Sequence, residues 1–305
     1  MDIIPYAQLK DKHRLFPLFY HAGHTPLDYR TFERRSQLDF RFRDGPKGFC
    51  AIEDDTPVGF GGVMHIPTRT LCGEEVVGGV WAVSTDPNYM RRGIGRAIME
   101  AIHAYFRQQG FPFAFLTTYR SWGAYEMYRK LGYIEVPSVI KAPTAYKFLP
   151  AQDAVAGDPK IESPSQDSVA RLFEEFTADS TGFVVRPPDF FSLMVERGGF
   201  DTALSVGTED GYALVREFNG RIFIREIAAR NRTVQTTLLE ALEAKGKDVI
   251  IDPVVTTPGL MDGYVSNGYH TYNGRHGTVM VKPLADASFE EAYGDRFYMS
   301  SLEWF

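Results

Sequence analysis

The chain has 305 residues, of which 44% are hydrophobic, and a formal net charge of −6. This length accommodates two domains of ordinary size, and the apolar content is that of a globular protein. The acidic balance argues against a general nucleic-acid binder, because binding phosphate backbones requires a basic surface. With only two cysteines, neither a disulfide framework nor a cysteine-based metal site is expected. No signal peptide and no membrane-spanning stretch is recognisable, so we expect a cytoplasmic protein without membrane attachment.

The first half of the chain predicts an α/β domain. Residues 9–42 alternate apolar and charged positions, with breaks at Pro17 and at residues 23–26, and predict two successive helices. A meander of three antiparallel strands follows, and its last strand leads into a glycine-rich loop and a helix. A further strand, a short helix and a final strand complete the pattern. The predicted strands are 48–52, 58–69, 76–83, 111–118 and 133–141, and the later helices are 97–106 and 122–131.

The loop between the third strand and its helix has the sequence Arg91-Arg-Gly-Ile-Gly-Arg96. The N-terminus of a helix presents backbone N–H groups and the positive end of the helix dipole, which together favour phosphate. Gly93 and Gly95 permit close backbone approach, and the arginines add positive charge. The loop therefore predicts a phosphate site. An ordinary strand-to-helix turn is the alternative, because Gly-x-Gly alone is a weak motif.

The second half repeats the order of the first after a linker at residues 149–159. It predicts a helix at 168–177 and strands at 201–206, 211–218 and 221–228. Tyr128 and Gly132 recur as Tyr264 and Gly268, in both cases 136 positions later. This spacing predicts a diverged duplication, with chance similarity of two α/β halves as the alternative.

Only the first copy keeps the glycine loop. In the second half the corresponding stretch is Asn231-Arg-Thr-Val-Gln-Thr236, where Thr233 and Gln235 replace the glycines. We therefore predict a catalytic domain at 1–150, a degenerate domain at 160–285 that serves as a scaffold or substrate wall, and a tail at 286–305. The last nine residues are rich in aromatic side chains, so the tail is expected to dock on the body.

Together these features resemble the GCN5-related N-acetyltransferase (GNAT) superfamily in a tandem two-domain arrangement, with partial similarity to the enhanced-intracellular-survival type. The signature Gln/Arg-x-x-Gly-x-Gly/Ala falls on residues 90–95, and the Tyr-x-x-Leu-Gly-Tyr pattern falls on residues 128–133. Met90 departs from the signature, which has Gln or Arg there. The resemblance implies an α/β fold of two tandem GNAT-like domains, each a mixed, mostly antiparallel sheet flanked by helices.

The resemblance also implies an N-acetyltransferase that moves an acetyl group from acetyl-CoA, as co-substrate, to a primary amine of a small molecule or peptide. The loop would bind the pyrophosphate of CoA, and the backbone of Ala82 and Val83 would bind the pantetheine arm and the acetyl carbonyl. Ser121 stands where relatives often have Asn. No metal is implied. The expected cofactor-binding residues are Ala82, Val83, Arg91, Arg92, Gly93, Ile94, Gly95, Arg96 and Ser121.

Two residues receive catalytic roles from the resemblance. Tyr128 would protonate the leaving sulfur, with simple core packing as the alternative. The carboxylate of Phe305 would act as the base, with docking for stability as the alternative. Because of Met90, a non-catalytic sensor that binds acetyl-CoA or CoA stays open as a second function. The sequence identifies neither the acceptor amine nor the oligomeric state.

Overall fold

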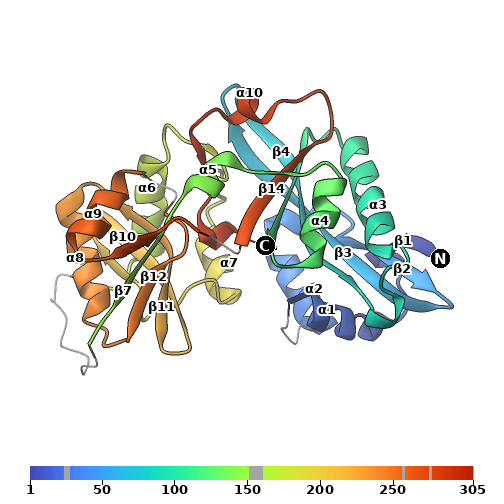
Figure 1. Cartoon of the computed structure of the whole chain (residues 1–305), viewed down its shortest axis with the longest axis horizontal. Coiled ribbons are helices and arrows are strands. Elements are labelled where there is room, and N and C mark those ends of the chain that lie inside the picture. Colours follow the sequence, from blue (N-terminus) through green and yellow to red (C-terminus); the bar gives the residue numbers. More distant parts are fainter. Residues whose placement is uncertain (24–27, 151–160, 256–257, 275–276, 305) are drawn as a thin grey trace.

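The protein was analysed as a computed structural model that describes residues 1–23, 28–150, 161–255, 258–274 and 277–304. The two halves lie side by side, and each is built on one sheet with helices packed against it (Figure 1). Across the described residues, no helix has both the length and the apolar character needed to cross a membrane.

The first sheet is mixed and mostly antiparallel, with the strand order β1-β2-β3-β4-β5-β14-β6. β4 and β5 pair in parallel in its centre, β8 joins β3 at the edge, and β15 pairs in parallel with β8. Its strands are β1 (Asp2–Pro5), β2 (Gly48–Glu53), β3 (Thr56–Thr70), β4 (Gly73–Thr85), β5 (Phe113–Tyr119), β6 (Ile134–Glu135), β8 (Thr181–Gly182), β14 (Gly277–Pro283) and β15 (Phe297–Tyr298).

Two pairs of helices cover the faces of this sheet. α1 (Phe16–Gly23) and α2 (Tyr29–Leu38) pack on one face, and α3 (Ile94–Gln108) and α4 (Gly123–Lys130) pack on the other. The predicted strand at 133–141 is wrong beyond its first residues, since β6 ends at Glu135 and α5 (Pro137–Lys141) follows. Pro137 lies in the first turn of α5, where its missing N–H and fixed φ favour a helix start.

The second sheet has the strand order β13-β7-β12-β11-β10-β9. The predicted strand at 201–206 is wrong except at Val206, because Ser205 donates from its N–H (2.9 Å) and hydroxyl (2.6 Å) to the carbonyl of Asp201 and closes a turn. The strands are β7 (Thr144–Phe148), β9 (Val206–Thr208), β10 (Gly211–Phe218), β11 (Arg221–Ala229), β12 (Val249–Asp252) and β13 (His270–Tyr272); the helices are α6 (Gln166–Phe176), α7 (Phe190–Glu196), α8 (Arg232–Glu243) and α9 (Met261–Ser266). α10 (Phe289–Tyr293) packs instead in the core of the first sheet.

The two sheets exchange one strand each. β7 belongs to the first half of the chain but lies in the second sheet, and β14 lies in the first (Figure 1). β7 pairs with β12 and β13, and β14 pairs with β5 and β6. Each exchanged strand brings a lysine to the end of a helix in its host: Lys282 donates to the carbonyl of Leu131, and Lys147 to that of Asn267 at 2.9 Å. The boundary near residue 150 stays a prediction, but the sheets do not separate there.

The repeat inferred from the tyrosines is visible in the geometry of both copies. The rings of Tyr128 and Tyr133 are 5.8 Å apart at an interplanar angle of 62°, and those of Tyr264 and Tyr269 are 5.2 Å apart at the same 62°. Each helix ends at a glycine with positive φ, 90° at Gly132 and 78° at Gly268. The two segments therefore share their local structure.

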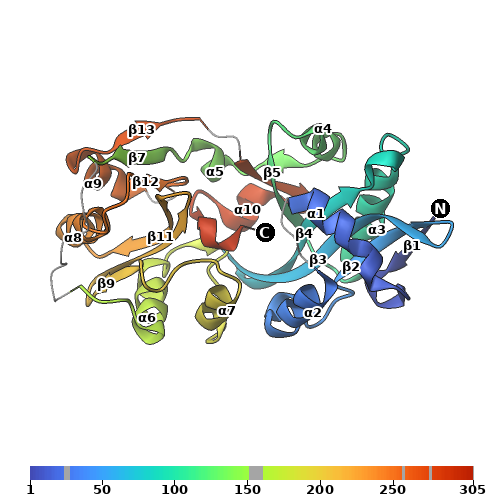
Figure 2. The ribbon, with the colours of Figure 1, turned by 90° about the horizontal axis from the view of Figure 1, so that it is seen from below.

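The described part of the tail lies between the halves (Figure 2). β15 pairs in parallel with β8, and a 3-10 turn at Ser301–Glu303 follows. Four apolar side chains of this segment are buried: Phe297, Tyr298, Met299 and Leu302. Phe305 lies outside the described residues.

Candidate active site

The first sheet opens between β4 and β5. These parallel strands pair only from Gly78 to Val80 against residues 114–116, although β4 continues to Thr85 and β5 to Tyr119. Beyond the last pair the two strands diverge and leave a splay at their carboxyl ends. Open parallel α/β sheets bind ligands in the crevice at the carboxyl ends of diverging strands, and the β4–β5 pair offers the same local arrangement.

A β-bulge lies on the β4 arm of the splay. The β3–β4 register shifts between the Phe60–Ser84 and Gly62–Trp81 pairs, and Ala82 has a φ of +50°. A non-glycine residue in this region stores strain, and bulges are a common means of redirecting backbone groups near functional sites. The structure therefore places Ala82 and Val83, the two strand residues expected at the cofactor, at the bulged edge of the opening.

The glycine loop leads into α3. Arg91 and Gly93 have φ values of +66° and +81°, and Gly93 is the N-cap residue of the helix. No acidic residue lies in the first turn of α3, so no carboxylate there opposes an incoming anion. A Cβ added at Gly95 would lie 3.3 Å from Sδ of Met127 on α4, which shows how closely the loop meets that helix.

A hollow of about 490 Å³ lies between the start of α3 and α4. Its lining includes the side chains of Arg91, Arg96 and Lys130 and one carboxylate, that of Glu126. Three cations beside a helix N-terminus suit a phosphate group. Sequence reasoning missed Lys130, whose signal was its place on the helix that carries the tyrosine motif.

Of the nine expected cofactor residues, only Arg91 and Arg96 line this hollow, and Arg92 and Ser121 are held elsewhere. Arg92 stacks on Tyr89, with its guanidinium carbon 4.8 Å from the ring centroid, and lies 3.7 Å from Glu53. Ser121 is exposed in the turn before α4. The structure therefore brings Arg91 and Arg96 together at the hollow, but not Arg92 or Ser121.

Tyr128 lies on α4 and is 6% exposed. Burial raises the pKa of its phenol, so the hydroxyl stays protonated at neutral pH. Within the described residues this hydroxyl has no hydrogen-bond partner. A protonated, unengaged phenol can act as a proton donor, and its ring also packs in the core, so the geometry accommodates both roles.

The face of the splay toward α1 and α2 is aromatic. Trp81 on β4 packs against Phe19 and Phe32, with ring centroids 6.2 Å and 5.0 Å away. At the end of β5, Tyr119 lies against Trp122 at 4.7 Å. Trp304 of the tail reaches the same place, since a Cβ added at Gly277, the partner of Tyr119 in β14, would lie 2.9 Å from its ring.

The second sheet has a splay of its own, and the tail fills it. β11 and β12 pair only from Arg221 to Phe223 against residues 249–251. Beyond this point Ser301 donates its hydroxyl to the carbonyl of Arg225 (2.9 Å), and the Arg225 guanidinium donates to the carbonyl of Ser301. The space left among these residues is only about 10 Å³.

The loop of the second half is also closed. Gln235 is 1% exposed and donates to the carbonyl of Leu260 at 2.8 Å, while Arg232 donates to the carbonyl of Asp262 at 2.9 Å. Both bonds join the start of α8 to the region of α9. The space that holds the cationic hollow in the first half is thus occupied by the protein's own side chains.

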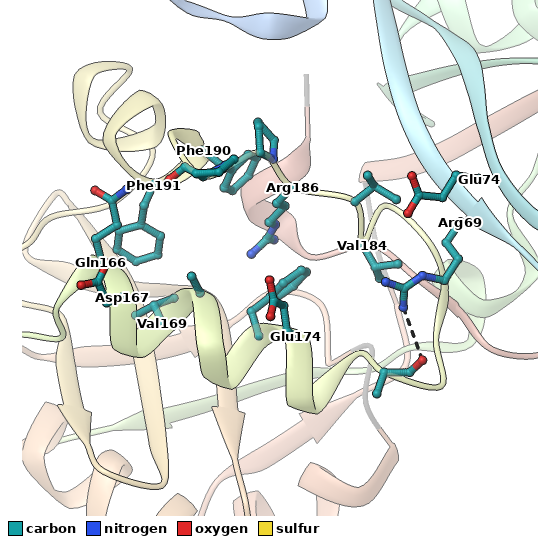
Figure 3. Close-up of a pocket in the computed structure, with 16 residues that line it drawn as sticks. Arg69, Glu74, Gln166, Asp167, Val169, Glu174, Val184, Arg186, Phe190 and Phe191 are labelled. Carbon is teal, nitrogen blue, oxygen red and sulfur yellow. Dashed lines mark hydrogen bonds between the residues drawn. The ribbon is translucent and has the colours of Figure 1, made fainter.

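A larger cavity, of about 650 Å³, lies between α6, α7 and the β3–β4 hairpin (Figure 3). Arg186 projects into it between the rings of Phe173 (3.5 Å) and Phe190 (4.4 Å). Its guanidinium also holds Glu226 and, through Nε at 2.9 Å, Glu303 of the tail. This cavity adjoins the hairpin turn, at the end of β4 away from the splay, and it contains none of the expected site residues.

Comparisons with known proteins agree with this geometry. Residues 11–133 match the acetyltransferase (GNAT) family. A GCN5-related N-acetyltransferase from Kribbella flavida superposes with a TM-score of 0.65 at 16% identity, covering 93% of this chain and 72% of its own. Eis1 from Mycobacterium abscessus superposes with a TM-score of 0.61 at 19% identity, covering 93% of this chain and 74% of its own. A tandem GNAT protein from the clavulanic acid biosynthesis pathway superposes with a TM-score of 0.55 at 14% identity, covering 94% of this chain and 99% of its own.

No protein of curated function matches the chain. The family match covers the splay, the glycine loop and the tyrosine motif, while the structural likeness extends over both halves. Residues 11–133 therefore form an acetyltransferase (GNAT) domain, and the chain as a whole has the fold of tandem GNAT proteins. The predicted fold class is confirmed. Acetyl-CoA is the acetyl donor that this family generally uses.

Proposed function

We propose that the protein transfers an acetyl group from acetyl-CoA to a primary amine of a small molecule or peptide, at the splay of the first sheet. The observation that carries this proposal is the coincidence of three features at one end of that sheet. The strands diverge, a bulge redirects the backbone at Ala82, and a helix N-terminus faces a hollow with three cationic side chains.

The residues of the hollow and loop suit the phosphates of CoA. Arg91, Arg96 and Lys130 supply positive charge, and Gly93 and Gly95 keep the loop free of β-carbons that would hold a phosphate away. Met90 is 56% exposed, so this position contributes no buried contact. The backbone N–H groups of the loop supply the remaining donors of the proposed site.

The chemistry requires a neutral amine, a donor for the developing oxyanion and a proton for the leaving thiolate. A lysine-like amine has a pKa of about 10.4, so a base or a desolvating pocket must favour its neutral form. The N–H of Val83, beside the bulge, is the proposed oxyanion donor. Tyr128 is the proposed acid, because burial keeps its phenol protonated.

The base stays assigned to the terminal carboxylate of Phe305 as a proposal. Support comes from the neighbouring residues: Trp304 packs beside Tyr119 at the end of β5, and Glu303 is held by Arg186. A terminal carboxyl has an ordinary pKa of about 3.5, so it serves as a base only where burial raises that value.

Calorimetry with acetyl-CoA, combined with a free-thiol assay over a panel of amines, tests the proposal. We expect micromolar binding and turnover on at least one amine. Tight binding with no turnover on any amine would instead favour the sensor function that Met90 left open. Arg216→Gln, an exposed change on the second sheet, serves as the control that leaves acetyl-CoA binding unchanged.

A further inference from the structure

We propose that Arg225 and the aromatic side chains of Tyr119, Trp122 and Trp304 recognise an acceptor that carries a carboxylate next to an apolar or aromatic group. These four residues are called the junction cluster below. The inference rests on the proposed function, since it names the class of amine that would reach the splay.

Arg225 owes its direction to a bulge. The β10–β11 register shifts between the Leu214–Glu226 and Val215–Ile224 pairs, which leaves Arg225 as the extra residue of β11. Bulged residues are turned away from the regular alternation of a strand. Arg225 therefore sits at the position in the second half that the strained bulge occupies in the first, and it lies close enough to Tyr119 of the first half for that residue to influence its pKa.

The guanidinium of Arg225 is only partly satisfied. Nη2 donates to the carbonyl of Ser301, whereas Nε is buried and has no hydrogen-bond partner among the described residues. The neighbouring carboxylates are engaged elsewhere: Glu226 accepts from Arg186, and Asp252 accepts from Tyr264 at 2.7 Å. No ion pair between Arg225 and a carboxylate is found in the part of the chain that the structure describes.

An unpaired, half-buried cation is costly unless an anion compensates it. Burial, with a further effect of the like charge on Arg216, lowers the pKa of Arg225 to about 10, so it remains protonated at neutral pH. Arginine binds carboxylates through parallel N–H donors, and in a guanidinium these pairs are Nε with Nη2 and Nη1 with Nη2. A carboxylate on the acceptor would satisfy these donors.

The aromatic members of the cluster indicate the rest of the ligand. Tyr119 and Trp122 are 44% and 42% exposed and lie 4.7 Å apart, so together they present an aromatic surface. The indole Nε1 of Trp304 is buried without a partner within the described residues, which provides another unused donor. Trp304 packs against the core on the α1–α2 face of the sheet, whereas the cationic hollow lies between α3 and α4 on the other face.

The first experiment measures binding and does not depend on acetyl transfer. Phenylacetate and its neutral counterpart 2-phenylethanol are titrated against the intact protein, and quenching of the three tryptophans is followed. We expect phenylacetate to bind at least about tenfold more tightly, as one good charged hydrogen-bond pair allows. Arg225→Gln should abolish this preference, Arg225→Lys should restore part of it, and Arg171→Gln, at an exposed position on α6, should retain it.

Equal binding of the two probes to the wild type, or an unchanged preference in Arg225→Gln, would overturn the proposal. Denaturant unfolding of each variant shows that a lost preference does not reflect lost structure. Removal of Phe305 moves the chain's terminal carboxylate back to Trp304 and so tests whether its original position supplies the anion. If phenylacetate binds more tightly after that removal, Arg225 serves the tail and not the acceptor.

The second experiment compares tryptophan with tryptamine as acceptors, since the two differ only in the carboxylate. We expect a kcat/KM at least about tenfold higher for tryptophan, lost in Arg225→Gln through KM rather than kcat. Faster acetylation of tryptamine would overturn the inference while leaving acetyl transfer intact. Absence of turnover on every amine would overturn the proposed function, and the probe titration would then still decide whether an anion binds.

Discussion

The two splays of this molecule have the same strand arrangement and opposite contents. In the first sheet the opening between β4 and β5 meets a glycine loop and a hollow of about 490 Å³. In the second sheet the opening between β11 and β12 is filled by Ser301 of the tail, and about 10 Å³ remain. The fold alone therefore does not make a site. Whether a splay is open to a ligand depends on the side chains at the start of the following helix and on the path of the tail.

One contact shows how the exchange of small and large residues closes the second site. In the first half, Gly95 of the loop faces the long side chain of Met127 on α4. In the second half, the buried side chain of Gln235 faces Gly263 on α9, where an added Cβ would lie 1.8 Å from Oε1 of the glutamine. The first half therefore has the small residue in the loop and the large one on the helix, whereas the second half has the large residue at the loop and the glycine on the helix.

The largest effect should come from the network that anchors the tail in the second half. Arg186→Met leaves Glu226 and Glu303 buried without their cation and should cost about 3–5 kcal/mol of unfolding free energy. Arg171→Met, which removes an exposed pair with Glu175, should cost no more than about 1 kcal/mol. Urea unfolding of both variants makes the comparison, and equal losses would show that the buried network does not anchor the tail.

His103 should make stability depend on pH through the first half. Burial and the nearby Lys282 lower its pKa from 6.5 to about 4, and its ring is hydrogen-bonded to Tyr133 at 2.9 Å. Because the unfolded chain takes up the proton first, stability is full above pH 6.5 and falls as the pH drops toward 4, by about 3 kcal/mol. Unfolding of His103→Gln should lose this part of the pH dependence, whereas exposed His13→Gln should keep it.

The glycine loop should be needed in one half only. Gly95→Val places a branched side chain against Met127 and into the phosphate approach, so the Kd for acetyl-CoA should rise about 100-fold, or about 2.7 kcal/mol. Thr233→Val, at the corresponding stretch of the second half, should leave the Kd unchanged. Calorimetry on both variants decides the point, and a normal Kd for Gly95→Val would refute the phosphate assignment.

Replacing Tyr128 should lower turnover, whereas replacing its counterpart Tyr264 should lower stability, and both effects should be smaller than those above. Tyr128→Phe removes an unengaged hydroxyl, so kcat should fall about tenfold with little change in stability or acetyl-CoA binding. Tyr264→Phe removes a buried hydrogen bond to Asp252 and should cost about 1–3 kcal/mol of stability without lowering kcat. Unchanged turnover in Tyr128→Phe would make Tyr128 a packing residue.

Much of the fold followed from local pattern. The meander, the loop, α3 and the tyrosine motif were predicted because alternation, glycines and an amphipathic period are properties of contiguous sequence. The same holds for β10 and β11, whose predicted starts at Gly211 and Arg221 are confirmed. Pro137 was the misread signal: it opens α5, whereas the prediction continued a strand through it.

The site was predictable at its loop and not at its partners. Gly93 and Gly95 can be recognised from the sequence motif. Lys130 lines the hollow only because α4 packs beside the start of α3. Arg225 and Tyr119 are more than a hundred positions apart and meet only when the two sheets come together. The exchange of β7 and β14 could not be predicted either, because the local sequence of a strand does not determine which sheet it joins.

That exchange bears on how the chain is made. β5 ends at Tyr119, but its partner β14 begins only at Gly277. One edge of β5 therefore stays unpaired until most of the chain has left the ribosome. Pairings between such distant segments slow folding, because loop closure precedes the contacts that reward it. An unpaired β5 edge in a nascent chain is also a template for aggregation. We therefore expect a fragment that stops at residue 150 to be insoluble, and the intact protein to refold slowly and as one cooperative unit.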